Sequence, residues 1–159
     1  MESQRCEAQG CLQSITSSSV RVTVDYDISI KTAIRRGKYS FVDDIGDDNF
    51  APNQNRSGVR RVLIHFIHFD RAVMIKEVMK GLRCRRVRPA DLTELLAIGE
   101  QYPQIQRRAW VVALGSSWLR ISSSVYVPIL SGNTTSRSVL LWPRDQDWIP
   151  GCLFASVKT

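Results

Sequence analysis

The segment Arg88–Gly99, RPADLTELLAIG, decides much of the fold of this chain. Pro89 disfavours helix at the residue before it and has no amide to donate, so the chain is expected to arrive there extended. Asp91 is then the predicted N-cap, and Glu94 can return a hydrogen bond to its amide, which is the capping-box arrangement. The leucines after Asp91 fall on one helical face, and Gly99 is suited to ending the helix. The segment therefore predicts a short core helix rather than an active site.

Outside this helix, apolar patterns predict several strands. Residues 20–30 alternate apolar and polar side chains at period two, which is typical of a half-buried strand. Val62–Phe69, VLIHFIHF, is apolar on both faces, as expected of a central strand that is covered on each side. Four further strands are predicted toward the C-terminus: Trp110–Leu114, Ser124–Leu130, Ser138–Trp142 and Cys152–Val157.

Further helices are predicted between these strands. Ser29 is placed to cap a short helix that Gly37 closes, and Asp70 is placed to cap a second helix with apolar side chains at helical spacing. Pro103 is expected to open one more turn. This order of elements predicts an α+β fold with a mostly antiparallel sheet, a short C-terminal strand meander and two to four helices grouped on one face.

The length and composition predict a single globular domain, since 43% of the 159 residues are hydrophobic. Residues 1–19 are polar and lack a continuous apolar run, so we expect a mobile leader before a single domain at residues 20–159. Four cysteines without a secretion signal favour reduced thiols and a cytoplasmic location. No apolar run approaches the roughly 18 residues of a membrane span, so no membrane partner is expected.

The net charge of +7 is concentrated in the middle of the chain. Residues 56–108 contain twelve basic and five acidic side chains. The predicted site for an anion or an acidic partner is a set of arginines in this region: Arg83, Arg85, Arg86, Arg88, Arg107 and Arg108. Guanidinium forks suit phosphate, and Tyr102 or Trp110 nearby could supply a stacking surface. The alternative is that the arginines keep a connector between two helices solvated.

Motifs of catalysis and of metal or cofactor binding give little support to an enzyme. His65 and His68 are the only histidines, and their odd spacing in a strand sends them to opposite faces, where one metal could not easily take both. The run Gly115–Ser117 is not the nucleophile pattern G-x-S-x-G and predicts a strand-ending turn. Glycine-rich nucleotide motifs are absent from the sequence. We therefore assign no catalytic, metal-binding or cofactor-binding residue and expect no cofactor.

The chain resembles a family of small uncharacterised bacterial proteins over most of residues 20–158. The resemblance rests on Arg88-Pro89-Ala90, Glu94-Leu95-Leu96, Gly99, Tyr102-Pro103, Gln106-Arg107, Val112–Ser116, Val127-Pro128, Leu130, Trp148 and Phe154–Lys158. The chain departs from the family pattern at Cys84–Val87, which looks like an insertion. No activity is attached to that family, so the resemblance implies none.

Together these patterns predict a small non-enzymatic binding domain that uses the basic surface of residues 56–108 to hold an acidic macromolecule, either protein or nucleic acid. Two alternatives stay open from the sequence. One is a nucleic-acid-binding accessory protein. The other is a hydrolase or metal-dependent enzyme that uses His65 or His68.

Overall fold

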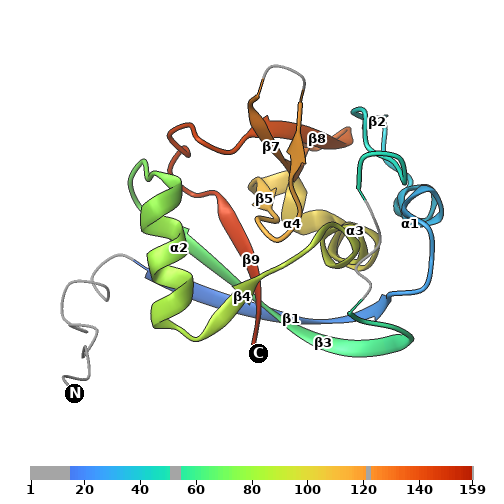
Figure 1. Cartoon of the computed structure of the whole chain (residues 1–159), viewed down its shortest axis with the longest axis horizontal. Coiled ribbons are helices and arrows are strands. Elements are labelled where there is room, and N and C mark those ends of the chain that lie inside the picture. Colours follow the sequence, from blue (N-terminus) through green and yellow to red (C-terminus); the bar gives the residue numbers. More distant parts are fainter. Residues whose placement is uncertain (1–14, 51–54, 121–122, 159) are drawn as a thin grey trace.

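The computed structural model describes residues 15–50, 55–120 and 123–158. Within these ranges it contains nine strands and four helices, an α+β architecture (Figure 1). The strands are β1 Ile15–Asp25, β2 Phe41–Val42, β3 Val59–Phe69, β4 Val87–Pro89, β5 Val111–Val112, β6 Trp118–Leu119, β7 Val125–Gly132, β8 Arg137–Pro143 and β9 Leu153–Lys158. The helices are α1 Ile30–Gly37, α2 Ile75–Cys84, α3 Leu92–Gln101 and α4 Pro103–Arg108.

All nine strands belong to one mixed, mostly antiparallel sheet. Its order is β1-β3-β9-β5-β7-β8-β2, with β4 paired to β9 and β6 paired to β7. Only the β5–β9 and β2–β8 pairs are parallel. The successive strands β6, β7 and β8 form an antiparallel meander, whereas β9 leaves it and inserts between β3 and β5. The predicted fold class is therefore confirmed.

The sheet has a hydrophobic core on each face. Neighbouring residues of one strand enter different cores, as Phe66 and Ile67 of β3 do, because side chains alternate across a strand. The first core lies under α1, α3 and α4, and the second lies under α2. Figure 1 shows α2 on one side of β9 and the other three helices on the other side. The expected grouping of helices on one face thus holds for three of the four, because the second apolar face of β3 needs a helix of its own.

The capping box of α3 is confirmed, but its predicted stop is wrong. The Asp91 carboxylate accepts from the amide of Glu94, and the Glu94 carboxylate accepts from the amide of Asp91. Gly99 does not end the helix, which continues to Gln101 and leads directly into α4 at Pro103. A side chain at Gly99 would overlap the hydroxyl of Tyr39, so this glycine serves close packing.

Other local predictions have mixed outcomes. Ser29 caps α1 as expected, by accepting from the amide of Thr32. Asp70 does not cap α2, which begins five residues later with Met74 as its N-cap. The first strand begins at Ile15, within the range predicted as a leader, and residues 1–14 lie outside the described residues.

Among the described residues, no helix is long and apolar enough to cross a membrane.

Candidate functional site

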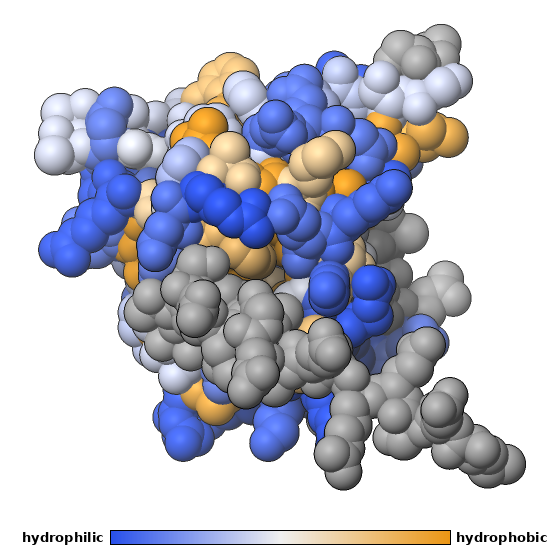
Figure 2. Space-filling view, turned by 90° about the vertical axis from the view of Figure 1, so that its left-hand side faces the viewer, coloured by the Kyte–Doolittle hydropathy of each residue, from blue (hydrophilic) through white to orange (hydrophobic). Residues whose placement is uncertain are grey.

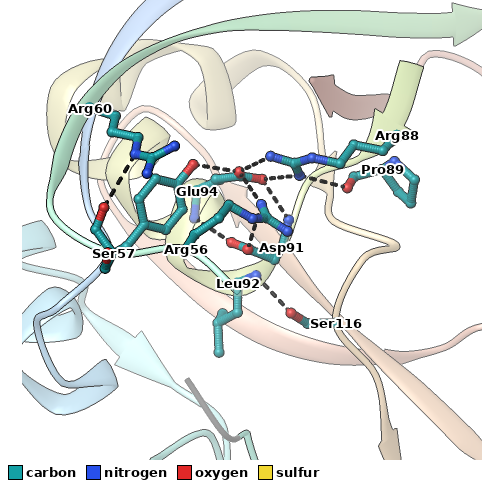
Figure 3. A network of polar contacts seen from close by, with 10 residues as sticks. Arg56, Ser57, Arg60, Arg88, Pro89, Asp91, Leu92, Glu94 and Ser116 are labelled. Carbon is teal, nitrogen blue, oxygen red and sulfur yellow. Dashed lines mark hydrogen bonds and ion pairs between the residues drawn. The ribbon is translucent and has the colours of Figure 1, made fainter. Parts of the chain in front are cut away.

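A buried carboxylate, that of Glu94, joins segments that are far apart in the sequence. Its side chain is fully buried at the start of α3. Arg88 of β4 donates to both oxygens, at 2.6 Å from Oε1 and 3.0 Å from Oε2. Arg56 and the Tyr26 hydroxyl donate to Oε1 at 2.8 and 2.7 Å, and the Asp91 amide donates to Oε2 at 2.9 Å (Figure 3). Helix α3, strand β4, the turn after β1 and the loop before β3 therefore meet at one ionised group.

The charges around Glu94 are strongly coupled. Burial by itself would raise the pKa of Glu94, but hydrogen bonds from Arg88, Asp91 and Tyr26 outweigh it and hold that pKa below its usual value. Burial and the charge of Glu94 raise the pKa of Asp91 and raise the pKa of Tyr26 to about 12. Because Oε1 of Glu94 already accepts three hydrogen bonds, the carboxylate has no free position from which to take a proton from a substrate. This network stabilises the fold and is not suited to acid–base chemistry.

A polar cavity of about 340 Å³ lies beside this network, at the start of α3. Thr93, Ser116 and Ser117 line it together with Asp91. The Ser116 hydroxyl accepts from the amide of Leu92 at 2.9 Å, so it satisfies one of the unpaired amides of the first helical turn. Neither histidine is among the described residues that line the cavity, and the Asp91 carboxylate there accepts from the amide of Glu94 as the helix cap. The turn is thus better suited to holding the helix start than to nucleophilic catalysis.

The same turn requires glycine at position 115. A Cβ added to Gly115 would lie 2.6 Å from the carbonyl oxygen of Ala90, and the Gly115 amide donates to that same oxygen at 2.8 Å. We expect Gly115→Ala to lower the free energy of unfolding by about 1–3 kcal/mol, because backbone must move to relieve the overlap. Urea denaturation would measure the loss, and Gly46→Ala is the control because nothing lies within 4 Å of a Cβ there. Equal stability of the two variants would contradict this role.

The structure does not bring the six predicted arginines to one place. Arg88 is bound to Glu94, and Arg107 donates to the carbonyl of Asn133 at 2.8 Å. Arg108 is exposed at the end of α4, on the side of the first core. Arg83 is exposed on α2, on the side of the second core, and Arg85 and Arg86 follow it in the turn to β4. The sheet therefore separates Arg83 from Arg107 and Arg108.

Several cations do gather on the α2 side of the sheet. Lys76, Lys80 and Arg83 are exposed and spaced by four and three residues, so they share one face of α2. Arg61 lies an even number of residues from Ile67 of the second core and therefore points to the same side as α2. We define the α2-side cationic surface as Lys76, Lys80, Arg83, Arg61, Arg21 and Lys158. Figure 2 views the molecule from the α2 side and shows hydrophilic side chains with apolar patches between them.

The strand register places the last two members of this surface. Arg21 is the partner of Leu63, and Lys158 lies two residues beyond Ser156, the partner of His65. Leu63 and His65 have the same parity as Ile67, so Arg21 and Lys158 also point to the α2 side. Leu63 lies between them and is 37% exposed, so the described helices leave its side chain partly accessible. None of the six cations forms an ion pair within the described ranges.

The two histidines lie on opposite faces of β3, as predicted. In the described ranges, no three potential metal ligands come together.

Comparison with known proteins gives no relative: no family model, curated protein sequence or solved structure matches the chain.

Proposed function

We propose that this protein is a small, non-enzymatic, cytoplasmic binding domain that holds an acidic macromolecule against its α2-side cationic surface. The observation that supports this proposal is that six exposed cations, from α2 and from strands β1, β3 and β9, lie on the same side of the sheet. Such a surface attracts polyanions and speeds their association. The exposed Leu63 within it adds apolar area that a partner could bury.

Two further observations support a binding role rather than an enzymatic one. The buried carboxylate of Glu94 accepts hydrogen bonds from structural partners on both of its oxygens. His65 and His68 lie on opposite faces of β3, so they could not act on one substrate atom together. The cytoplasmic location is supported by Cys152, a buried thiol that forms no disulfide within the described ranges.

Binding to polyanions tests the proposal directly. The probes are fluorescein-labelled double-stranded DNA and labelled polyglutamate, titrated with the full chain at several salt concentrations. We expect Lys76→Ala, Lys80→Ala and Arg83→Ala, combined in one variant, to weaken binding by at least about tenfold. The dependence of log K on log salt should become shallower by about one for each phosphate that the variant no longer neutralises.

A matched control removes three cations from another surface. Lys31, Arg35 and Arg36 are exposed on α1, on the opposite side of the sheet, and their combined replacement with alanine changes the net charge by the same amount. We expect this variant to bind nearly as well as the natural chain. Equal losses in both variants would show that net charge alone governs binding. The absence of salt-sensitive binding to either probe would overturn the proposal.

The two probes separate the kinds of partner. Tighter binding to DNA than to polyglutamate at equal salt would identify nucleic acid as the partner class, and the reverse preference would identify an acidic protein.

A further inference from the structure

Strand β1 is an edge of the sheet, and side chains close only part of that edge. The side-chain amide of Gln101 makes the two hydrogen bonds that the backbone of a neighbouring strand would make. Its Oε1 accepts from the Thr23 amide at 2.9 Å, and its Nε2 donates to the Thr23 carbonyl at 2.7 Å. The Tyr102 hydroxyl donates to the carbonyl of Arg21 at 2.8 Å. The C-terminal half of β1 is therefore capped by the end of α3.

No described residue caps the N-terminal half of the same edge. In an antiparallel pair, alternate residues direct both backbone groups away from the partner strand, and Thr23 fixes which ones do so. The backbone amides and carbonyls of Ser17 and Ser19 must then point away from β3, as must the backbone amide of Arg21. In the part of the chain that the structure describes, these outward groups have no hydrogen-bonding partner, and the segment from Ile15 to Val20 has no proline or charge that would protect it from pairing.

An apolar groove runs beside the open half of β1. It has a volume of about 370 Å³ and lies between the sheet and α4. Its apolar lining includes Val20, Phe66, Ile105 and Leu153, and Arg108 is the charged residue among those that line it. A strand added to β1 would direct every second side chain toward this groove, because side chains alternate at period two.

The charge of the protein decides which occupant fits best. A second copy would bring two chains of net charge +7 together and would place its own Arg108 near the same edge. An acidic peptide would meet complementary charge instead. We propose that the open edge of β1 binds an extended segment of an acidic partner by strand addition, with an apolar side chain in the groove and a carboxylate beside Arg108. This site is on the α4 side of the sheet and does not depend on the α2-side cationic surface.

Hydrogen exchange of the full chain gives the sharpest test. The probe is a short peptide that alternates valine and glutamate, compared with the same peptide carrying lysine in place of glutamate. In the free protein, the amides of Ser19 and Arg21 should exchange quickly, whereas those of Ser18 and Val20, which face β3, should be protected. Addition of the glutamate peptide should protect Ser19 and Arg21 and leave Ser18 and Val20 unchanged.

Fluorescence anisotropy with the same peptides adds a test by substitution. Ser19→Pro removes an outward amide without breaking the β1–β3 ladder, and we expect it to weaken binding by about tenfold. Arg108→Glu should have a similar effect and should favour the lysine peptide. Lys31→Glu makes the same charge change on α1, which contributes no residue to this groove or to the α2-side cationic surface, and it should change the affinity by less than about twofold.

Several results would overturn the proposal. One is the absence of binding to the glutamate peptide, and another is binding that leaves the exchange of Ser19 and Arg21 unchanged. Protection of these two amides in the free protein would mean that another part of the chain already covers the edge. Protection that rises with protein concentration, together with a dimer in analytical ultracentrifugation, would identify a second copy as the occupant. Loss of polyanion binding in the α2 variants bears only on the proposed function, because those residues are not part of this groove.

Discussion

Glu94→Ala is expected to lower the free energy of unfolding by about 3–5 kcal/mol, because it removes a fully buried carboxylate and leaves two half-buried guanidinium groups without their main partner. Arg88 and Arg56 would lose hydrogen bonds of 2.6 to 3.0 Å, and the amide of Asp91 would lose its acceptor. Urea denaturation followed by circular dichroism measures the change. Arg71→Ala, which breaks an exposed ion pair with Glu77, is the control and should change the stability very little. Comparable losses in the two variants would contradict the central role of Glu94.

The same carboxylate should make stability depend on pH. The pKa of Glu94 is lower in the folded protein than its usual value of about 4.3, so its contribution is fully present above that value and is lost as the pH falls through the folded pKa. The raised pKa of Asp91 acts in the opposite sense, since it favours folding as the pH falls. We therefore expect the free energy of unfolding to fall more steeply with decreasing pH in Asp91→Asn and less steeply in Glu94→Gln. Urea midpoints measured between pH 3 and pH 7 would show both changes. If the midpoints of both variants and of the natural chain changed with pH in parallel, the opposite effects assigned to Glu94 and Asp91 would be contradicted.

Arg137→Ala is expected to cost about 3–5 kcal/mol as well, for a different reason. Arg137 is only 9% exposed, and its guanidinium lies 5.0 Å from the ring centre of Tyr39. It donates to the carbonyls of Gly37 and Gly99 and to the side chain of Gln106. These carbonyls belong to the last turns of α1 and α3, where unpaired acceptors and the helix dipoles favour a cation. Removing Arg137 would leave three buried acceptors without a donor.

A conservative variant separates the hydrogen bonds from the charge. Arg137→Lys keeps the positive charge but cannot reach all three acceptors with one ammonium group, so we expect an intermediate loss. Arg36→Ala is the control, because it removes an exposed arginine from the last turn of α1, the helix that Arg137 caps through Gly37. Thermal and urea denaturation should rank the stabilities as the natural chain and Arg36→Ala first, then Arg137→Lys, then Arg137→Ala. A lysine variant as stable as the natural chain would show that charge alone matters.

Local signals in the sequence predicted those parts of the structure that depend on neighbouring residues. The capping box of α3 needs only Asp91 and Glu94, which are three residues apart, and it was predicted correctly. The opposite faces of His65 and His68 follow from strand alternation alone. The stop at Gly99 was wrong because the constraint on this glycine comes from Tyr39, in a distant part of the chain.

The positions of the candidate site residues depend more on pairing between distant parts of the chain. Arg88 was grouped with its neighbours in sequence, but its position is set by Glu94, whose other partners Arg56 and Tyr26 are 38 and 68 residues away from it. The helical spacing of Lys76, Lys80 and Arg83 was available in the sequence and could have revealed the stripe on α2. Arg21 and Lys158 could not be added to that surface without the strand register, because their partners lie elsewhere in the chain.

The central position of β9 has a consequence for how the chain reaches its native state during synthesis. β9 is made after every other strand, yet it joins the β1–β3 pair to β5 and the strands beyond it. Until residues 153–158 have left the ribosome, no strand of the described sheet joins β3 to β5. Pairs such as His65 with Ser156 must then form across 91 residues, a separation that slows folding. The nascent chain should therefore expose two incomplete half-sheets, and its exposure to chaperones should end only when the last strand is in place.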